Sequence, residues 1–223
     1  MTKPKPLIIF DAMGVIFPFP EGDDIQYGLF AFLQNKGHEF SSKQKKSWEK
    51  NFYQKATRGQ ISSIEALEKL LPSHNAKELE KLETEYLSSD FFKLDQNLIP
   101  VIQKLKNNFF TAILSNDIPA WSRTLRKRFD LEQYFDFAVI SGDANIFRKP
   151  KKGIYEYLFR KIKQTELDIK EIYFIDDSLG NLKTAHSFGI HTIYKILKSN
   201  DSVDYEPNYR INNLTGLLEI FNF

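Results

Sequence analysis

The chain has 223 residues, enough for one substantial α/β core and a smaller insertion. Hydrophobic residues make up 42% of it, as in folded globular proteins, and a net charge of +2 gives no electrostatic reason to expect nucleic acid as a partner. The absence of cysteine excludes disulfides, thiol nucleophiles and zinc–thiolate sites. The apolar run at residues 7–10 is far too short for a signal-peptide core or a membrane span, so we expect a cytoplasmic protein with no membrane partner.

The first predicted element is a buried strand at residues 7–10, and a long helical stretch follows it. Ser42 is the expected N-cap of the second helix in that stretch, and Ser62 or Ser63 followed by Glu65 resembles a capping box at the third. The helical patterns cover residues 23–36, 42–57, 62–71 and 75–87, with no convincing strand among them.

We therefore expect two domains. Residues 17–92 would form a helical cap domain inserted into a core made of residues 1–16 and 93–223. The alternative is one continuous domain with a long helical crossover.

The remainder of the chain alternates helices and strands. Further apolar runs without polar alternation predict strands at residues 111–114, 137–140, 172–175 and 191–194. Helical patterns lie at residues 98–107, 120–129, 153–163 and 179–188. This alternation predicts an α/β fold, a Rossmann-like parallel sheet with helices on both faces and the helical cap inserted.

Polar residues cluster after four predicted strands, at the carboxyl ends where ligands bind in open parallel sheets. An aspartate after a strand is by itself more often a cap than a catalyst, but coincidence at four strand ends in order is improbable. The set is Asp11 after the first strand, Ser115 and Asn116 after the second, Lys149 after the third, and Asp176 and Asp177 after the fourth.

These residue types are suited to phosphoryl transfer. An aspartate can act as a nucleophile and form an aspartyl-phosphate, and the phosphate charge is neutralised by Mg²⁺ and by a lysine. The adjacent carboxylates of Asp176 and Asp177 repel each other unless a cation or hydrogen bonds offset the repulsion. The hydroxyl and backbone N–H groups at Ser115 and Asn116 can hold further phosphate oxygens.

Over nearly its whole length the sequence resembles the haloacid dehalogenase (HAD) superfamily. Residues 7–17, 112–116, 148–155 and 173–181 resemble its four motifs in order. The predicted cap matches the position of the family's small α-helical cap. Residues 58–62 resemble a phrase common in the cap of the subgroup that includes small sugar-phosphate phosphatases.

The resemblance implies a role for each matching residue. Asp11 would be the nucleophile, and Lys149 would neutralise both Asp11 and the phosphate, which Ser115 and Asn116 would help to bind. It also implies Mg²⁺ as the cofactor and a small phosphorylated molecule as the partner, for a monomer or homodimer. The implied metal ligands are Asp11, the backbone carbonyl of Met13, Asp177 and, second to it, Asp176.

Position 13 departs from the family pattern. Phosphatases of the family usually carry aspartate there, as the acid for the leaving group and then the base for water, and methionine can do neither. Loss of one general acid or base typically costs about 10²–10⁴-fold in rate. Asp117, Asp23 and Asp24 are the candidate replacements.

Three readings follow from this departure. The first is a Mg²⁺-dependent phosphatase, and the second is a 2-haloacid-dehalogenase-like enzyme, whose halide leaving group needs no proton. Tyr155, six residues after Lys149, resembles a dehalogenase feature, although a tyrosine there equally packs the helix. The third is a catalytically silent binding protein. The Asp176–Asp177 pair favours the phosphatase, because a metal-free reaction has no use for it.

Overall fold

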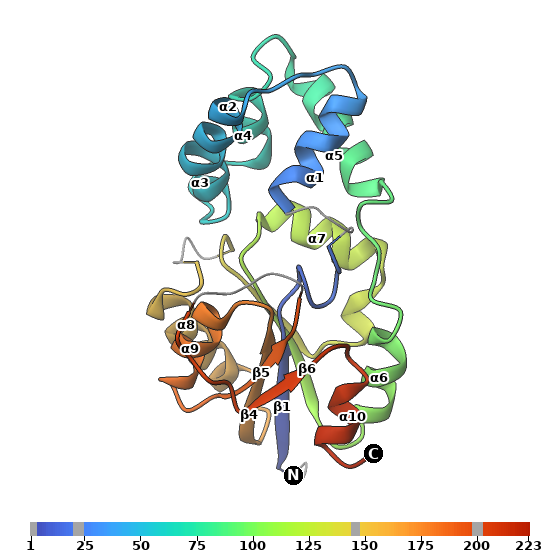
Figure 1. Cartoon of the computed structure of the whole chain (residues 1–223), viewed down its shortest axis with the longest axis vertical. Helices are drawn as coiled ribbons and strands as arrows, with labels where there is room; N and C mark the ends of the chain where they lie inside the picture. The colour runs from blue at the N-terminus through green and yellow to red at the C-terminus, as the bar shows by residue number, and fades with distance from the viewer. Residues whose placement is uncertain (1–3, 20–24, 144–147, 198–202) are drawn as a thin grey trace.

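A parallel six-stranded sheet forms one half of the computed structural model, which describes residues 4–19, 25–143, 148–197 and 203–223 (Figure 1). The strands are β1 (Lys5–Phe10), β2 (Phe110–Ser115), β3 (Phe137–Ile140), β4 (Ile169–Asp176), β5 (His191–Lys195) and β6 (Tyr209–Ile211). Their spatial order is β3-β2-β1-β4-β5-β6, and every neighbouring pair is parallel. The predicted Rossmann-like sheet is confirmed.

Helices cover both faces of the sheet because β1 is buried on both sides. Ile8 and Phe10 join one apolar cluster, and Leu7 and Ile9 join the other; none of the four has exposed surface. The first cluster includes buried residues of α6 (Leu98–Leu105), α7 (Pro119–Arg128), the short 3₁₀ turn η2 (Leu131–Gln133) and α10 (Gly216–Ile220). The second includes those of α8 (Lys152–Gln164) and α9 (Leu179–His186).

A helical insertion, residues 25–88, lies between β1 and β2 at the opposite end of the molecule from the chain termini (Figure 1). It contains α1 (Ile25–Asn35), α2 (Ser42–Trp48), the π-helical turn η1 (Glu49–Tyr53), α3 (Gln54–Ala56), α4 (Ser63–Glu68) and α5 (Ala76–Ser88). The helical character expected of this stretch is present. Its status as a separate cap domain stays a prediction.

The N-caps of α2 and α4 test two predictions made from the sequence. Ser62 caps α4 and forms the expected capping box with Glu65. The expectation of Ser42 as a cap is wrong, because Ser41 is the N-cap of α2 and forms a capping box with Gln44. Gln44 stands at the third helical position only when the cap is Ser41, so the reciprocal pair of hydrogen bonds selects that residue.

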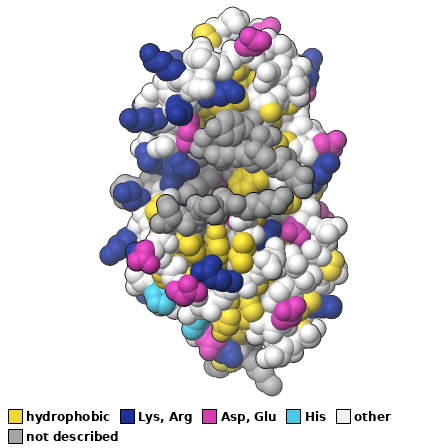
Figure 2. All heavy atoms as spheres, viewed as in Figure 1, with side chains coloured by type: hydrophobic (Ala, Val, Ile, Leu, Met, Phe, Trp, Pro, Cys, Tyr) yellow, Lys and Arg dark blue, Asp and Glu magenta, His cyan; other side chains and the backbone are white. Residues whose placement is uncertain are grey.

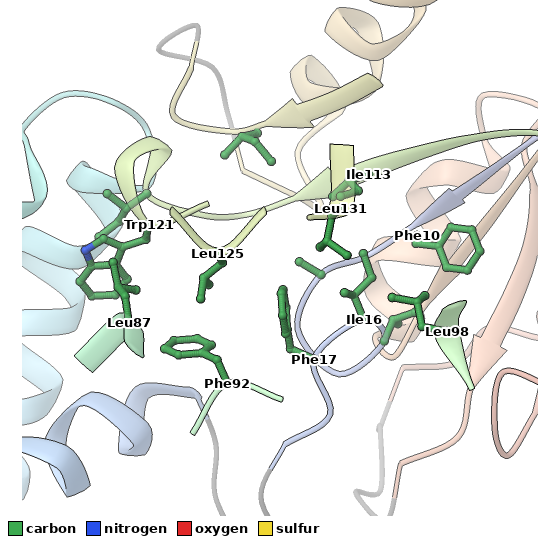
Figure 3. Close-up of a cluster of buried hydrophobic side chains, with 14 of the residues drawn as sticks. Phe10, Ile16, Phe17, Leu87, Phe92, Leu98, Ile113, Trp121, Leu125 and Leu131 are labelled. Carbon is green, nitrogen blue, oxygen red and sulfur yellow. The ribbon is translucent and has the colours of Figure 1, made fainter. Parts of the chain in front are cut away.

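The helical insertion is joined to the sheet by a continuous apolar cluster (Figure 3). Phe17, in the turn after β1, packs edge-on against Phe92 with ring centroids 6.2 Å apart. Trp121 of α7 lies 5.4 Å from Tyr86 of α5, measured between ring centroids. These contacts seat α5 on α7 and bring the insertion over the sheet end that carries the predicted site.

Two short elements near the C-terminus, β6 and α10, were not predicted. Strand β6 has only three residues, and Tyr209 and Arg210 in it are exposed, so the segment lacks the apolar run that marks a buried strand. Among the described residues, no helix has the length and apolar character needed to span a bilayer. On the face shown in Figure 2, basic side chains gather along the margin of the molecule formed by the helical insertion.

Candidate active site

The sheet register explains why residues far apart in the sequence meet. Phe10 pairs with Ile113 of β2 and with Ile175 of β4. Asp11 and Asp176, which follow Phe10 and Ile175, therefore lie at the same edge of the sheet. The Asp11 amide donates to the Ile175 carbonyl over 2.9 Å. Because β1 lies between β2 and β4, the order of the strands reverses beside Asp11, at the switch point where open α/β sheets bind ligands.

Lys149 connects two of the predicted carboxylates. Its Nζ lies 2.8 Å from Asp11 Oδ2 and 2.6 Å from Asp176 Oδ2. The lysine side chain is 1% exposed, against 12% for Asp11 and 0% for Asp176. Burial by itself would lower the pKa of Lys149, but the two carboxylates raise it above its ordinary value, so the ammonium group stays charged.

Asp176 holds this lysine and is itself held by the start of α9. Its Oδ1 accepts from the Ser178 amide over 2.8 Å, and the Asn181 side-chain amide lies 3.0 Å from both of its oxygens. The Asn181 carbonyl in turn accepts from the buried Tyr155 hydroxyl over 2.8 Å. Tyr155 is therefore a packed residue of α8 that supports this loop.

Asp177 is the more accessible carboxylate of the pair, and it lies against the turn that carries Met13. A Cβ on Gly14 would be 2.6 Å from the Asp177 Cγ, and Gly14 has a positive φ of 82°. Burial and the adjacent charge of Asp176 raise the pKa of Asp177 to about 7. Burial also raises the pKa of Asp11 well above its ordinary value, which Lys149 opposes and the two other aspartates reinforce.

The acidic cluster has the composition of a site for a divalent cation. Asp11, Asp176 and Asp177 each offer an oxygen within 4.8 Å of the others. In the turn after β1, Gly14 N donates to Phe17 O and Phe17 N donates to Ala12 O, and no backbone N–H of the described turns and loops donates to the Met13 carbonyl. The Met13 side chain packs against the apolar core.

The two predicted residues at the carboxyl end of β2, Ser115 and Asn116, do different things. Ser115 is buried at the strand end, 2% exposed. Asn116 uses its side chain to position Lys149: its Nδ2 donates to the Lys149 carbonyl over 3.1 Å, and its Oδ1 accepts from the Lys149 amide over 2.7 Å. The Asn116 side chain is thus engaged, which leaves the backbone N–H for the predicted contact with substrate.

Of the three candidate replacements for the missing acid, Asp117 is described and Asp23 and Asp24 lie outside the described residues. The Asp117 Oδ1 accepts from the Ile118 amide over 2.7 Å. Burial raises the pKa of Asp117 to about 7, although that hydrogen bond and Arg126 and Arg148 oppose the shift. A carboxyl group with this pKa carries a proton for much of the time near neutral pH.

Sequence reasoning missed Lys195, the last residue of β5. Its Nζ lies 3.0 Å from Asp95 Oδ2 and donates to the Val15 carbonyl over 3.3 Å. The signal was available, because a lysine directly follows the predicted strand 191–194, at the same edge of the sheet.

Comparison with known families agrees with this geometry. The family model for haloacid dehalogenase-like hydrolases matches residues 5–189. The chain belongs to this family.

Individual relatives are distant. The chain is 24% identical over 140 residues to drimenol cyclase drtB of Aspergillus calidoustus, a match that takes in 61% of this chain and only 26% of that protein. The magnesium-bound HAD-hydrolase YfnB of Bacillus subtilis superposes with a TM-score of 0.66 at 20% identity, over 99% of this chain and 100% of that one. An L-2-haloacid dehalogenase of Xanthobacter autotrophicus, with chloropropionic acid covalently bound, gives a TM-score of 0.67 at 16% identity, over 98% of each chain.

Proposed function

We propose that this hydrolase is a Mg²⁺-dependent phosphatase that acts on a small phosphorylated molecule through an aspartyl-phosphate at Asp11. The observation that carries the proposal is the position of Lys149, which contacts Asp11 and Asp176 at once beside the further carboxylate of Asp177. This arrangement joins a nucleophile, a fixed cation and a surplus of negative charge, which together match the needs of phosphoryl transfer.

The donor set fits Mg²⁺. Magnesium prefers a few carboxylate and carbonyl oxygens, with water and substrate oxygens completing its shell. Asp11, Asp177 and the Met13 carbonyl would hold it, because Asp176 is already committed to Lys149, Ser178 and Asn181. Bound there, the ion would neutralise charge on the phosphoryl group and allow the nearby carboxylates to ionise together.

The chain's own residues account for the remaining requirements. The Asp11 carboxylate attacks phosphorus, and the bond to the leaving-group oxygen breaks as the acyl phosphate forms. Lys149 offsets the charge of Asp11 and of the phosphoryl oxygens, held in place by Asn116 and Asp176. Met13 offers no proton to the leaving oxygen, so good leaving groups should be favoured.

We also propose that residues 17–92 act as a cap that limits access to this site, with a small phosphorylated molecule rather than nucleic acid or a membrane as the partner. The helical insertion lies over the carboxyl ends of the strands, as a cap would require (Figure 1).

The test is hydrolysis of a phosphorylated-metabolite panel with and without Mg²⁺. Asp11→Asn should abolish activity while the fold survives, because an amide cannot form the acyl phosphate. Asp168→Asn, the same change at an exposed position, is the matched control and should keep full activity. Full activity in Asp11→Asn would show that another site or a contaminant is responsible.

A dehalogenase reaction is the second candidate, and Met13 is the observation that favours it. A halide leaves without a proton, so an acid at position 13 is unnecessary. Metal-independent halide release from a 2-haloacid, without phosphate hydrolysis, would select this reaction. Mg²⁺ binding without any turnover would instead indicate a catalytically silent binding protein.

A further inference from the structure

Two arginines at the junction between the helical insertion and the sheet carry buried Nε atoms that have no hydrogen-bond partner. They are Arg58 and Arg148. Neither takes part in any ion pair found among the described residues. Buried donors of native proteins are nearly always satisfied, so two unpaired Nε–H donors in one region call for a ligand.

Arg58 is fixed against the sheet by the residues on either side of it. The Thr57 carbonyl accepts from the Ser141 hydroxyl, just after β3. A Cβ on Gly59 would lie 2.2 Å from the Gly142 carbonyl oxygen, so the backbones touch there. The segment that carries Arg58 is thus seated on the sheet edge of the site.

Arg148 approaches the same segment from the sheet side. Its guanidinium carbon lies 5.9 Å from the centroid of the Tyr53 ring. The Tyr53 carbonyl accepts from the amide of Thr57, the residue before Arg58, so Tyr53 and Arg58 belong to the same turn of the chain. Arg148 also directly precedes Lys149, whose Nζ contacts Asp11. Arg148 therefore lies against the segment of residues 53–59 that carries Arg58, and its neighbour in the chain contacts the proposed nucleophile.

Within the described part of the chain, no carboxylate forms an ion pair with either arginine. Asp117 is an acid near Arg148: its amide donates to the Ser141 hydroxyl oxygen over 3.2 Å, and its carboxyl group feels the charge of Arg148. Burial nevertheless raises the pKa of Asp117 to about 7, so it is only partly ionised at neutral pH. The planar guanidinium is suited to two-point binding of a carboxylate or phosphate.

We propose that Arg58 and Arg148 bind a second anionic group of the substrate, a carboxylate or a phosphate, while Asp11 and Lys149 engage the group that is transferred. The substrate class is then a phosphate ester that carries a further negative charge. The identity of the transferred group rests on the proposed phosphatase function, but the anion site itself does not.

The first experiment measures binding of matched ligands to Asp11→Asn, in which turnover is blocked. The ligands are ω-carboxyalkyl phosphates of increasing length and their ω-hydroxyalkyl counterparts. For at least one chain length, the carboxyalkyl phosphate should bind about tenfold more tightly than its hydroxyalkyl counterpart, measured by calorimetry. Arg58→Gln and Arg148→Gln should each remove most of that gain. Arg160→Gln is the control, because Arg160 also lies over a tyrosine ring, 5.6 Å from the Tyr157 centroid, but is exposed.

The second experiment needs no phosphate chemistry, and it measures binding on the unmodified protein, with variants used only to assign resonances. Short dicarboxylates are titrated into the unmodified protein with ¹⁵N-labelled arginine, and the Nε–H resonances are followed, assigned with Arg58→Lys and Arg148→Lys. Both resonances should shift saturably, while those of exposed arginines stay in place.

The outcomes separate the two proposals. Shifted resonances in a protein that hydrolyses no phosphate ester would keep the anion site and remove the phosphatase. Hydrolysis of aryl phosphates, with no carboxylate preference and no shift of either resonance, would overturn the anion site and leave the phosphatase standing. In that case the two Nε atoms are satisfied by water alone.

Discussion

At position 13 the side chain is a thioether that packs on the apolar core and carries no proton to transfer. Without a positioned acid, a departing oxygen must bear its own charge, so rates should depend strongly on leaving-group pKa. Aryl and acyl phosphates should be cleaved far faster than alkyl or sugar phosphates. Met13→Asp should narrow this gap by about tenfold or more in a leaving-group series. A flat series in the unmodified protein would mean that another residue, with Asp117 the first to test, already donates the proton.

Asp117 should also leave a signature in the pH dependence of stability. Its pKa is raised by burial from 3.8 to about 7, so the folded protein binds this proton more tightly than the unfolded chain. The resulting contribution to stability is present below about pH 4 and is lost as the pH rises through 7. The stability of Asp117→Asn relative to the parent should therefore rise as the pH goes from about 4 to about 7 and stay constant above that, measured by urea unfolding. Parallel stability profiles for the two proteins would contradict the burial of this carboxyl group.

At the residue scale, sequence reasoning works where chemistry is tied to strand ends. Asp11, Lys149, Asp176 and Asp177 meet because a parallel sheet aligns its carboxyl edges. The part that Asn116 plays was not predictable, because its partner is the backbone of a residue 33 positions away, and backbone contacts leave no mark in residue types.

At the element scale, Gly14 shows how the turn after β1 makes room for the carboxylate of Asp177, which lies between β4 and α9. A methyl group on Gly14 would meet Asp177 at 2.6 Å, whereas Gly37, with a similar positive φ of 89°, has nothing within 4 Å. Gly14→Ala and Gly37→Ala should share a backbone cost of about 1–2 kcal/mol. Only Gly14→Ala should also weaken Mg²⁺ binding, measured by calorimetry, because it displaces Asp177. Equal Mg²⁺ affinity in the two variants would exclude Asp177 as a ligand.

Lys195 ties three segments together beneath the site. It joins the end of β5 to the Val15 carbonyl and to Asp95, and the Asp95 amide donates to the Ile16 carbonyl over 2.9 Å. Lys195→Met should cost about 3 kcal/mol in unfolding free energy, because it removes the only cation paired with the largely buried Asp95 carboxylate among the described residues. Adding Asp95→Asn should recover part of that loss in the double variant. Additive losses in the double variant would show that the pair is not coupled.

Elements with strong apolar patterns were the predictable ones. Of the five expected strands, residues 137–140 match β3 without change and three others differ by one or two residues at their ends. Strand β4 begins three residues earlier than expected, at Ile169, because its first part is polar and partly exposed. The N-cap of α2 was misplaced by one residue, because neighbouring serines can both cap a helix and the choice depends on the hydrogen bonds formed. Strand β6 was missed, because a three-residue edge strand depends on the strand that it pairs with.

At the scale of the whole molecule, the junction between the helical insertion and the sheet was beyond sequence reasoning. The fold class and the order of the elements follow from periodicity. Residues 56–59 lie directly on Ser141 and Gly142. This contact depends on the close approach of Gly59 to the Gly142 carbonyl and on the hydrogen bond from the Ser141 hydroxyl to the Thr57 carbonyl. That seating holds the segment that carries Arg58 against the residues after β3.

The proposed phosphatase reaction requires that Asp11 becomes phosphorylated, and the absence of an acid or base at position 13 makes this directly observable. Methionine cannot activate the water that would release the phosphate, so the intermediate should accumulate. Acid quenching after brief exposure to acetyl phosphate and Mg²⁺, followed by peptide mass spectrometry, should find a hydroxylamine-labile phosphoryl group on Asp11. The group should be missing without Mg²⁺ and in Asp11→Asn. Turnover of acetyl phosphate with an unmodified Asp11 peptide, or with a phosphoryl group on another residue, would contradict the account.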